Sequence, residues 1–422
     1  MKVTFRFIGN LLFILTLIIV LFSYAMFQGG FVSWFLFYSF LPILLYLLVL
    51  VCYPIKNWKV TRVLSGRLIK AGGTAQVVLT IERKFPFPLY YGIFEEIMSD
   101  SLNRKDRKHH NYSHLNEPEK LLFTRSMKKI FLIGFRKRIE IPFKLEELPR
   151  GEHKLEAVRV RISDVFGFVK KEHVFTLEDE LLVQPHEREI KLIDGAQSFE
   201  QGQTAVNSFQ LENTTVATGV REYEPGDRFS WIHWKQTAKN QMVMTKEFEI
   251  ERSNQLLLIL DATLPKNINP LAFEASVELA LSMLAKLENT TSDVHLLTIG
   301  SEVRSFSIRE SNQLKGDIRY YLTKIQPDGE ESFSRLLKET MQGQKRLERL
   351  VIFTSSIDDF FRLTIQELKQ RTAQIVVMFI QGSAFILESE QKMIAQMKKE
   401  GTKIHVLTER QLAATPLEVS IR

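Results

Sequence analysis

The sequence predicts an α+β multidomain protein with an N-terminal transmembrane helical hairpin, an antiparallel β-sandwich-like domain and a C-terminal doubly wound α/β domain. Three observations lead to this prediction. Two long segments near the N-terminus contain no charged residue. Short alternating segments with regular turns follow them, and continuous apolar runs separated by amphipathic stretches form the last part. We therefore divide the 422 residues into an anchor at 1–55, a β-rich domain at 56–187, a connector at 188–254 and an α/β domain at 255–422.

The two uncharged segments, at residues 7–27 and 31–53, are each long enough to cross a hydrocarbon core of about 30 Å as a helix. Gln28, Gly29 and Gly30 separate them and predict a tight turn. A signal peptide cleaved after Ser23-Tyr24-Ala25 is the alternative. The second segment would retain the protein in the membrane even in that case.

The net charge of +7 arises at the membrane-proximal end of the chain. No acidic residue precedes Glu82, whereas seven basic residues do, and the remaining 49 basic residues balance the 49 acidic ones. A nucleic-acid-binding protein would carry its basic patch on a folded domain, so we expect the lipid bilayer as a partner and no nucleic acid. Both ends of the hairpin are basic and its turn is not. The positive-inside rule then predicts a multi-pass protein of the cell membrane with a cytoplasmic N-terminus and cytoplasmic soluble domains.

Residues 56–187 have the pattern of short β-strands. Residues 75–81 alternate between apolar and polar, and 89–97 and 130–143 are rich in aromatic and branched side chains. Glycine and proline turns between them favour a small antiparallel sandwich. The polar segment 99–119 predicts a long loop. Its histidines, at 109, 110 and 114, suit either a metal or, as we expect, a solvated loop.

Residues 255–422 change to continuous apolar runs, each short and bounded by polar residues or glycine, as in buried parallel strands. These runs lie at 256–260, 294–299, 350–353, 375–380 and 404–407. Amphipathic stretches predict helices at 270–288, 310–325, 332–341, 358–369 and 388–399. Alternating strands and helices are typical of a doubly wound α/β domain.

The connector holds the densest chemistry of the chain, a signature segment at residues 217–251. It reads Arg-Glu-Tyr-Glu-Pro-Gly-Asp, then Ile-His-Trp-Lys, then Thr-Ala-Lys and a closing Glu-Phe-Glu. The signature candidates for partner binding are Arg221, Glu222, Tyr223, Pro225, Gly226, Asp227, Ile232, His233, Trp234, Lys235 and Lys239. These charged residues can form a polar network that braces the connector against the sheet, or they can join the aromatic residues in anchoring a protein partner. His233 as a catalytic base is a third possibility, although no recognisable serine or cysteine nucleophile motif accompanies it.

This signature resembles that of the domain-of-unknown-function family 58. Ser230 and Trp231 stand where many members carry arginines, and Lys239 replaces the usual arginine. The layout is also similar: two N-terminal helices and a β region ending in Arg150-Gly151 and Asp164-Val165-Phe166-Gly167 precede the signature. The resemblance implies a C-terminal von Willebrand factor A-like domain and a partnership with a MoxR-type AAA+ ATPase.

Such domains often bind Mg²⁺ through an Asp-x-Ser-x-Ser loop after their first strand. Here that loop reads Asp261-Ala-Thr263-Leu-Pro265, and Thr354-Ser355-Ser356 follow a later strand where an aspartate would be expected. Asp261 and Thr263 keep the ligand chemistry, but Pro265 has no ligating side chain. Mg²⁺ prefers carboxylates, so we predict no cofactor and no intact metal site, with Asp261 and Thr263 capping the following helix or turn instead.

The sequence lacks the phosphate loop, dinucleotide fingerprint, nucleophile elbow and zinc-protease motifs. We therefore expect a non-enzymatic, membrane-anchored scaffold or adaptor that works with a MoxR-type AAA+ ATPase in protein assembly or cell-envelope processes. The alternative is a cell-envelope enzyme that uses His233 and the acidic residues of the signature. A purely structural membrane component remains a third reading.

Overall fold

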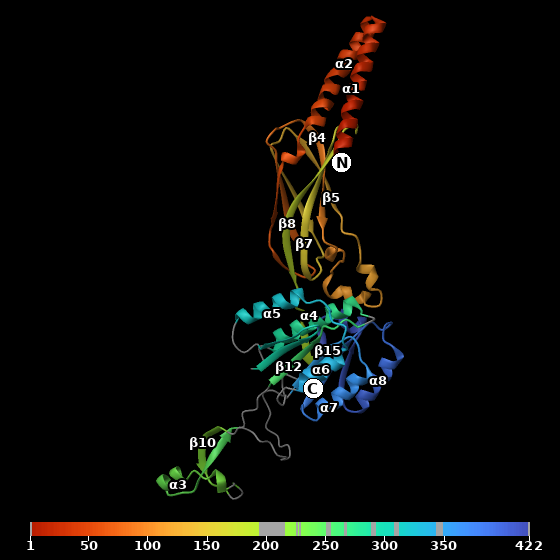
Figure 1. The fold of residues 1–422 in the computed structure, drawn as a ribbon. Helices are drawn as coiled ribbons and strands as arrows, with labels where there is room; N and C mark the ends of the chain where they lie inside the picture. Colours follow the sequence, from red (N-terminus) through yellow and green to blue (C-terminus); the bar gives the residue numbers. More distant parts are fainter. Residues whose placement is uncertain are drawn as a thin grey trace. The chain divides into compact units, whose positions relative to one another are not determined.

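The computed structural model describes residues 2–193, 216–224, 227, 229–249, 255–265, 268–287, 293–307, 312–342 and 349–420 (Figure 1). The chain divides into two compact units. The first comprises residues 1–187 together with 269–271 and 316–326, and the second comprises the remainder. The mixed α+β class and the order of two apolar helices followed by sheet-rich regions agree with the prediction from the sequence.

Two helices open the first unit, α1 (Lys2–Gln28) and α2 (Phe31–Cys52). The turn between them requires Gly29, whose φ of +60° lies in the left-handed region that favours glycine. Uncharged stretches of 22 residues in both helices, Phe7–Gln28 and Phe31–Cys52, are long and apolar enough to cross a membrane. Many of their large apolar side chains are exposed, as helices that face lipid require.

Two β-sheets follow in the first unit. The three-stranded sheet has the order β1 (Lys59–Leu64), β3 (Ala75–Glu82), β6 (Arg138–Leu145). The five-stranded sheet has the order β2 (Leu68–Lys70), β8 (Lys170–Gln184), β7 (Gly151–Ser163), β4 (Leu89–Met98), β5 (Met127–Gly134). Alternate residues of β6 are buried, as strict apolar–polar alternation predicts. Side chains from both sheets form one hydrophobic cluster, so the sheets enclose a common core. The short β2 runs parallel to β8, which departs from the all-antiparallel expectation.

The second unit is built on a six-stranded sheet. Its order is β14 (Val303–Ser307), β13 (Asp293–Ile299), β12 (Gln255–Asp261), β15 (Arg349–Thr354), β16 (Gln374–Ile380), β17 (Lys403–Leu407). All neighbours pair in parallel except β14, which is antiparallel to β13 at the edge. The five apolar runs of the sequence are the five parallel strands. The edge strand escaped prediction because it has no apolar run.

Helices cover both faces of this sheet. They are α4 (Pro270–Leu287), α6 (Phe333–Gln342), α7 (Asp359–Lys369), α8 (Glu388–Lys399) and the short α9 (Glu409–Ala413). Helix α5 (Asn312–Lys324) is divided, because its residues from 316 onward belong to the first unit. Leu257 and Ile259 of β12 share a cluster with α6, α7 and α8. Their neighbours Leu256, Leu258 and Leu260 point to the opposite face and are equally buried. Both faces of the strand are therefore buried from solvent, which explains its unbroken apolar sequence.

Strand β9 (Ile190–Ile193) lies at the start of the predicted connector. It pairs in parallel with β18 (Leu417–Ser420), a strand near the C-terminus of the chain. Arg188, just before β9, is buried and donates to the carbonyl oxygens of Leu412 and Ala414 at 2.9 and 2.6 Å. The first residues of the predicted connector are thus part of the folded second unit, held by a partner more than 200 residues away in sequence.

The first unit includes the C-terminal part of α5, and Arg150 holds it there. The Arg150 guanidinium is buried and donates to the carbonyl oxygens of Leu322 and Ile325 at 2.6 and 2.8 Å. These carbonyls lie at the end of the helix, where backbone acceptors lack intrahelical donors and a cation is favoured. Arg150, the arginine of the Arg150-Gly151 pair noted in the sequence, therefore caps the C-terminal end of α5.

Candidate functional site

The signature segment folds into a small hairpin with an inserted helix. Strand β10 (Val216–Glu222) pairs antiparallel with β11 (Met244–Glu249), and α3 (Trp234–Asn240) lies between them in sequence. A single turn of 3₁₀-helix (Phe229–Trp231) precedes α3. We call residues 216–249 the signature hairpin. Pro225 and Gly226 of the signature lie outside the described residues.

Asp227 ties the hairpin together by accepting hydrogen bonds on both carboxylate oxygens. Arg221 donates to Oδ1 at 2.7 Å, and the backbone N–H of Glu224 donates to Oδ2 at 3.1 Å. The Glu224 bond and then the Arg221 guanidinium hold the pKa of Asp227 below its usual range, although partial desolvation opposes them. These bonds lie within the hairpin itself. The sequence interpretation instead expected a network that braces the connector against the sheet.

His233 begins α3 as its N-cap. Its Nδ1 accepts a hydrogen bond from the backbone N–H of Gln236 at 3.2 Å, and its own backbone N–H donates to the Met244 carbonyl at 2.8 Å. An acceptor at Nδ1 leaves a neutral ring its proton on Nε2. The imidazole thus has a structural role at the helix start.

Other signature residues face solvent instead. Trp234 is 69% exposed and Phe229 is 77% exposed, while Ile232 is buried. Glu222, Lys235 and Lys239 are exposed as well, and Tyr223 is half-buried. The segment therefore has two parts: Arg221, Asp227, Ile232 and His233 hold its shape, and Phe229, Trp234, Lys235 and Lys239 are exposed on its surface.

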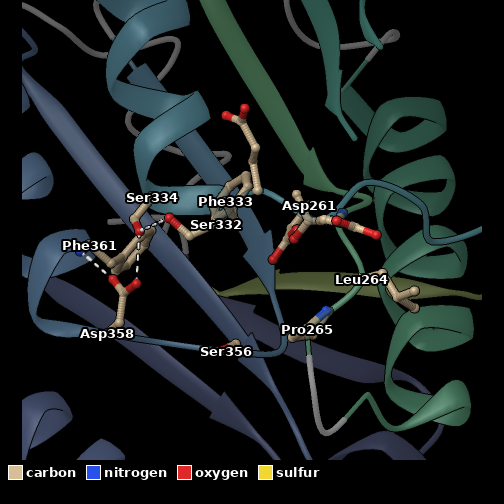
Figure 2. Close-up of a pocket in the computed structure, with 12 residues that line it drawn as sticks. Asp261, Leu264, Pro265, Ser332, Phe333, Ser334, Ser356, Asp358 and Phe361 are labelled. Carbon is tan, nitrogen blue, oxygen red and sulfur yellow. Dashed lines mark hydrogen bonds between the residues drawn. The ribbon is translucent and has the colours of Figure 1, made fainter. Parts of the chain in front are cut away.

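A pocket of about 230 Å³ opens at the carboxyl ends of the parallel strands in the second unit (Figure 2). Ligand sites in open α/β sheets lie at these strand ends. The lining residues come from three places: the end of β12 and the loop after it, the loop before α6 with the first turn of that helix, and the loop before α7 with the first turn of that helix. They are Asp261, Thr263, Leu264, Pro265, Glu330, Glu331, Ser332, Phe333, Ser334, Ser356, Asp358 and Phe361.

Asp261 is buried at the base of this pocket and has its hydrogen-bond donors within the chain. Thr263 donates to Oδ1 through its backbone N–H at 3.0 Å and through its hydroxyl at 2.7 Å. The Thr354 hydroxyl donates to Oδ2 at 2.7 Å. Burial raises the pKa of Asp261 to about 6, and the threonine hydrogen bonds only partly oppose this rise.

The donor set is a poor fit for a divalent cation. Asp261 is occupied by the two threonines, and Asp358 caps α7 by accepting from the Phe361 N–H at 2.6 Å and from the Ser334 hydroxyl at 2.9 Å. Across the described ranges, no three His, Cys, Asp or Glu side chains gather closely enough to hold a metal, and this includes the histidine loop at 108–114. Hard cations require several oxygen ligands at once, and Asp261 and Asp358 are already hydrogen-bonded within the chain. The other two acidic residues of the lining, Glu330 and Glu331, are exposed and do not complete a group of three such ligands among the described residues.

Sequence reasoning found only part of this pocket. It named Asp261, Thr263, Pro265 and Ser356 but missed the contributions of Ser332, Ser334 and Asp358. These three residues flank helix starts, and an Asp or Ser before an amphipathic helix is a common capping signal. That signal locates Asp358 in the sequence without showing that its loop meets the loop after β12.

The model of the family described as "Protein of unknown function DUF58" matches residues 219–382. The uncharacterized protein YeaD of Bacillus subtilis is 31% identical over 402 residues, which cover 94% of this chain and 95% of YeaD. Among solved structures, the PilB minor pilin of Streptococcus sanguinis is 9% identical over 76% of this chain and 84% of its own, with a TM-score of 0.27. The DNA glycosylase AlkC of Pseudomonas fluorescens, solved bound to DNA, is 12% identical over 32% and 33% of the two chains, with a TM-score of 0.17.

Both structural likenesses are too weak to carry an argument about fold or function. The similarity to YeaD, in contrast, extends over nearly the whole of both chains. The family match covers the signature hairpin and most of the parallel sheet. This chain therefore belongs to the family of YeaD and contains the DUF58 region.

Proposed function

We propose that the chain is a membrane-anchored adaptor whose signature hairpin binds a protein partner. The observation that carries this proposal is the exposure of large apolar side chains on the hairpin. Phe229, Trp231, Trp234, Met242 and Val243 are all exposed within a segment of fewer than 30 residues. Exposed clusters of this kind mark interaction sites, and tryptophan is among the residues that contribute most to binding energy at protein interfaces.

Charged side chains accompany these aromatic residues. Lys235 and Lys239 are one helical turn apart on α3 and exposed, and Glu222 and Glu224 are exposed at the end of β10 and just after it. Protein interfaces combine an apolar centre with a polar rim that selects the partner. The hairpin carries both components.

The residues described at the pocket support binding more than catalysis. Its lining contains three serines but no histidine, lysine or cysteine among the described residues. A serine nucleophile needs an adjacent base. Outside the pocket, His233 of the signature is the candidate base, and its Nδ1 already accepts a hydrogen bond as the N-cap of α3. These observations disfavour the alternative of a cell-envelope enzyme that uses the signature.

We further propose that the second unit is von Willebrand factor A-like and that the partner is a MoxR-type AAA+ ATPase. The doubly wound sheet and the Asp261-x-Thr263 loop after its central strand support the first point. The resemblance of the signature to its family supports the second. A cytoplasmic ATPase requires the domain on the same side of the membrane, and the basic residues at both ends of the hairpin of α1 and α2 support that orientation.

A direct binding measurement tests the proposal. The full chain in lipid nanodiscs is titrated with the purified MoxR-type ATPase of the same organism. We expect Trp234→Ala and Phe229→Ala each to weaken binding about thirtyfold, the effect of losing an interface residue that contributes about 2 kcal/mol. Phe385→Ala is the matched control, because Phe385 is an exposed aromatic residue outside the hairpin. Equal affinity for wild type and both hairpin variants would refute this role.

A further inference from the structure

Three loops meet at one end of the β-sheets in the first unit. They connect β3 to β4 (residues 83–88), β5 to β6 (135–137) and β7 to β8 (164–169). The strand register brings them together, because Leu89 pairs with Gly134 and Tyr91 pairs with Ser163. We call this set of loops the tip loops.

The tip loops expose large apolar side chains to an unusual degree. Phe85 is 65% exposed, Phe135 is 71% exposed and Phe166 is 63% exposed, and Val165 and Phe168 are similar. All three loops contribute. A cluster of exposed phenylalanines at one end of a domain is costly in water and marks a surface that meets an apolar environment.

Buried polar residues hold these loops in their exposed conformation. Asp164 is buried and accepts hydrogen bonds from the backbone N–H groups of Phe166 and Val169 at 2.9 and 2.6 Å. The Arg83 guanidinium, also buried, donates to the carbonyl oxygens of Phe87 and Gly134 at 3.0 and 3.1 Å. The outward direction of the phenylalanines is therefore built into the fold, and Asp164 explains the Asp-x-Phe-Gly stretch of the sequence.

The tip loops contact α1 and α2 within their apolar spans. Phe168 packs against Phe13 of α1 with ring centroids 6.0 Å apart. On α2, Tyr46 stacks on Phe87 at 5.3 Å and donates its hydroxyl to the Pro88 carbonyl at 3.0 Å. Lys171 at the start of β8 fixes the same junction by donating to the Val51 carbonyl at 2.8 Å.

These contacts give the depth of the loops. Phe13 lies six residues into the span that begins at Phe7, and Tyr46 lies six residues from the end of the span that closes at Cys52. At about 1.5 Å per helical residue, both positions are about 9 Å inside the apolar segments. Two independent contacts on two helices thus place the loops at the same level.

Basic side chains stand beside the phenylalanines. Lys84, Arg136, Lys137 and Lys170 are exposed in or next to the tip loops. Aromatic and basic residues together are characteristic of the membrane interface, where rings enter the acyl boundary and cations meet anionic headgroups. The positive charges of these four side chains complement the anionic headgroups of a lipid surface.

We propose that the tip loops insert into the membrane leaflet from which the β-sheets project, with Phe85, Phe135, Phe166 and Phe168 in the bilayer interface. The β-sheets are then seated in the membrane surface by their own loops in addition to the helices that anchor them. The proposal rests on α1 and α2 crossing a membrane. It goes beyond the adaptor function, because an adaptor needs the two helices as an anchor but does not need the loops to enter the bilayer.

Fluorescence quenching in nanodiscs tests this insertion with the full chain. In a Cys52→Ser background, which removes the single cysteine, Phe85→Cys and Phe166→Cys each receive an environment-sensitive nitrobenzoxadiazole label. Val20→Cys in the middle of α1 reports the hydrocarbon core. Leu122→Cys is the matched aqueous control, because Leu122 is 60% exposed and lies beyond Met98, at the other end of β4. The discs contain phosphatidylcholine and phosphatidylglycerol, with nitroxide-bearing lipid or aqueous iodide as the quencher.

We expect the labels at 85 and 166 to emit at shorter wavelength than the label at 122, to be quenched by nitroxide lipid and to be protected from iodide. Iodide quenching at 85 and 166 equal to that at 122, with position 20 still quenched by lipid, would overturn insertion while leaving the anchor intact. Protection from both quenchers would also overturn it, since protein would then cover the loops. Loss of lipid quenching at position 20 would instead refute the membrane anchor and the proposal with it.

Discussion

The Thr354 hydroxyl donates to Oδ2 of Asp261 at 2.7 Å, joining the ends of two neighbouring parallel strands inside the protein. Together with the bonds from Thr263, it satisfies a carboxyl group that is buried and away from solvent. The pair gives the acidic residue at the end of β12 a structural role. It also makes the charge state of Asp261 a determinant of stability.

We predict that stability falls as the pH rises from about 4 to about 6 through Asp261. Its pKa is raised by burial from 3.8 to about 6, so the folded protein binds this proton more tightly than the unfolded chain does. The contribution is full below pH 4 and is lost as pH rises through the folded pKa. A rise of this size corresponds to about 3 kcal/mol. Asp261→Asn should remove this part of the pH dependence in thermal melts of the detergent-solubilised chain. An unchanged profile in that variant would assign the effect to another group.

Magnesium should leave the melting temperature unchanged, because the oxygens of Asp261 and Asp358 are already hydrogen-bonded within the chain. A ligand present at 100 times its dissociation constant would stabilise the folded protein by about 2.7 kcal/mol. Thermal melts with and without Mg²⁺ measure this, with Ca²⁺ as a second hard cation. A stabilisation of that size that disappears in Asp261→Ala would show that the pocket does bind metal.

Substitutions in the signature hairpin should separate its two parts. The Asp227 carboxylate accepts from both the Arg221 guanidinium and the Glu224 N–H, and so links the parts of the hairpin. Asp227→Asn weakens the bond to Arg221. We therefore expect faster hydrogen exchange of the β10 and β11 amides in this variant. Trp234→Ala should leave exchange and melting unchanged, since Trp234 is mostly exposed, and should reduce only partner binding. Destabilisation by Trp234→Ala comparable to that of Asp227→Asn would mean that the ring is a packing residue.

Removing the helix cap at Arg150 should be costly. Arg150→Ala leaves the buried carbonyl oxygens of Leu322 and Ile325 without this donor, and each such group costs about 1–3 kcal/mol. We expect a large drop in melting temperature and in membrane abundance. Arg150→Lys keeps a cation at the helix end but not the fork of donors, so its loss should be smaller. Equal losses in the two variants would indicate that the role of Arg150 is not helix capping.

A reporter fused after Arg422 should be active only in its cytoplasmic form. Lys2, Arg6, Lys56 and Lys59 place basic charge at both ends of the helical hairpin, and its turn carries none. Parallel fusions to alkaline phosphatase and to green fluorescent protein measure this, because the two reporters are active on opposite sides of the membrane. Phosphatase activity at the C-terminus would place the soluble units outside and exclude a cytoplasmic ATPase as the partner.

Local patterns in the sequence were sufficient for much of the fold. The two uncharged segments became α1 and α2, and the five apolar runs became the five parallel strands of the second unit. Hydrophobic periodicity and segment length are properties of residues that are neighbours in sequence. They can therefore be recognised without knowing which distant residues each segment packs against. The signature likewise identified its family through the order of residues alone. The sequence also showed Asp227 and Arg221 to be close enough along the chain to pair.

Only the tertiary structure decided which distant residues meet. The donor to Asp261 lies 93 residues away, the acceptor of Arg150 lies 172 residues away, and β9 pairs with a strand near the C-terminus. The tip loops likewise looked like ordinary turns until their contacts with Phe13 and Tyr46 gave their depth along the helices. Burial and long-range pairing depend on the packing of the whole unit, which no local period encodes. The roles of Asp261, Arg150 and the exposed phenylalanines therefore followed from the fold and not from their neighbours in sequence.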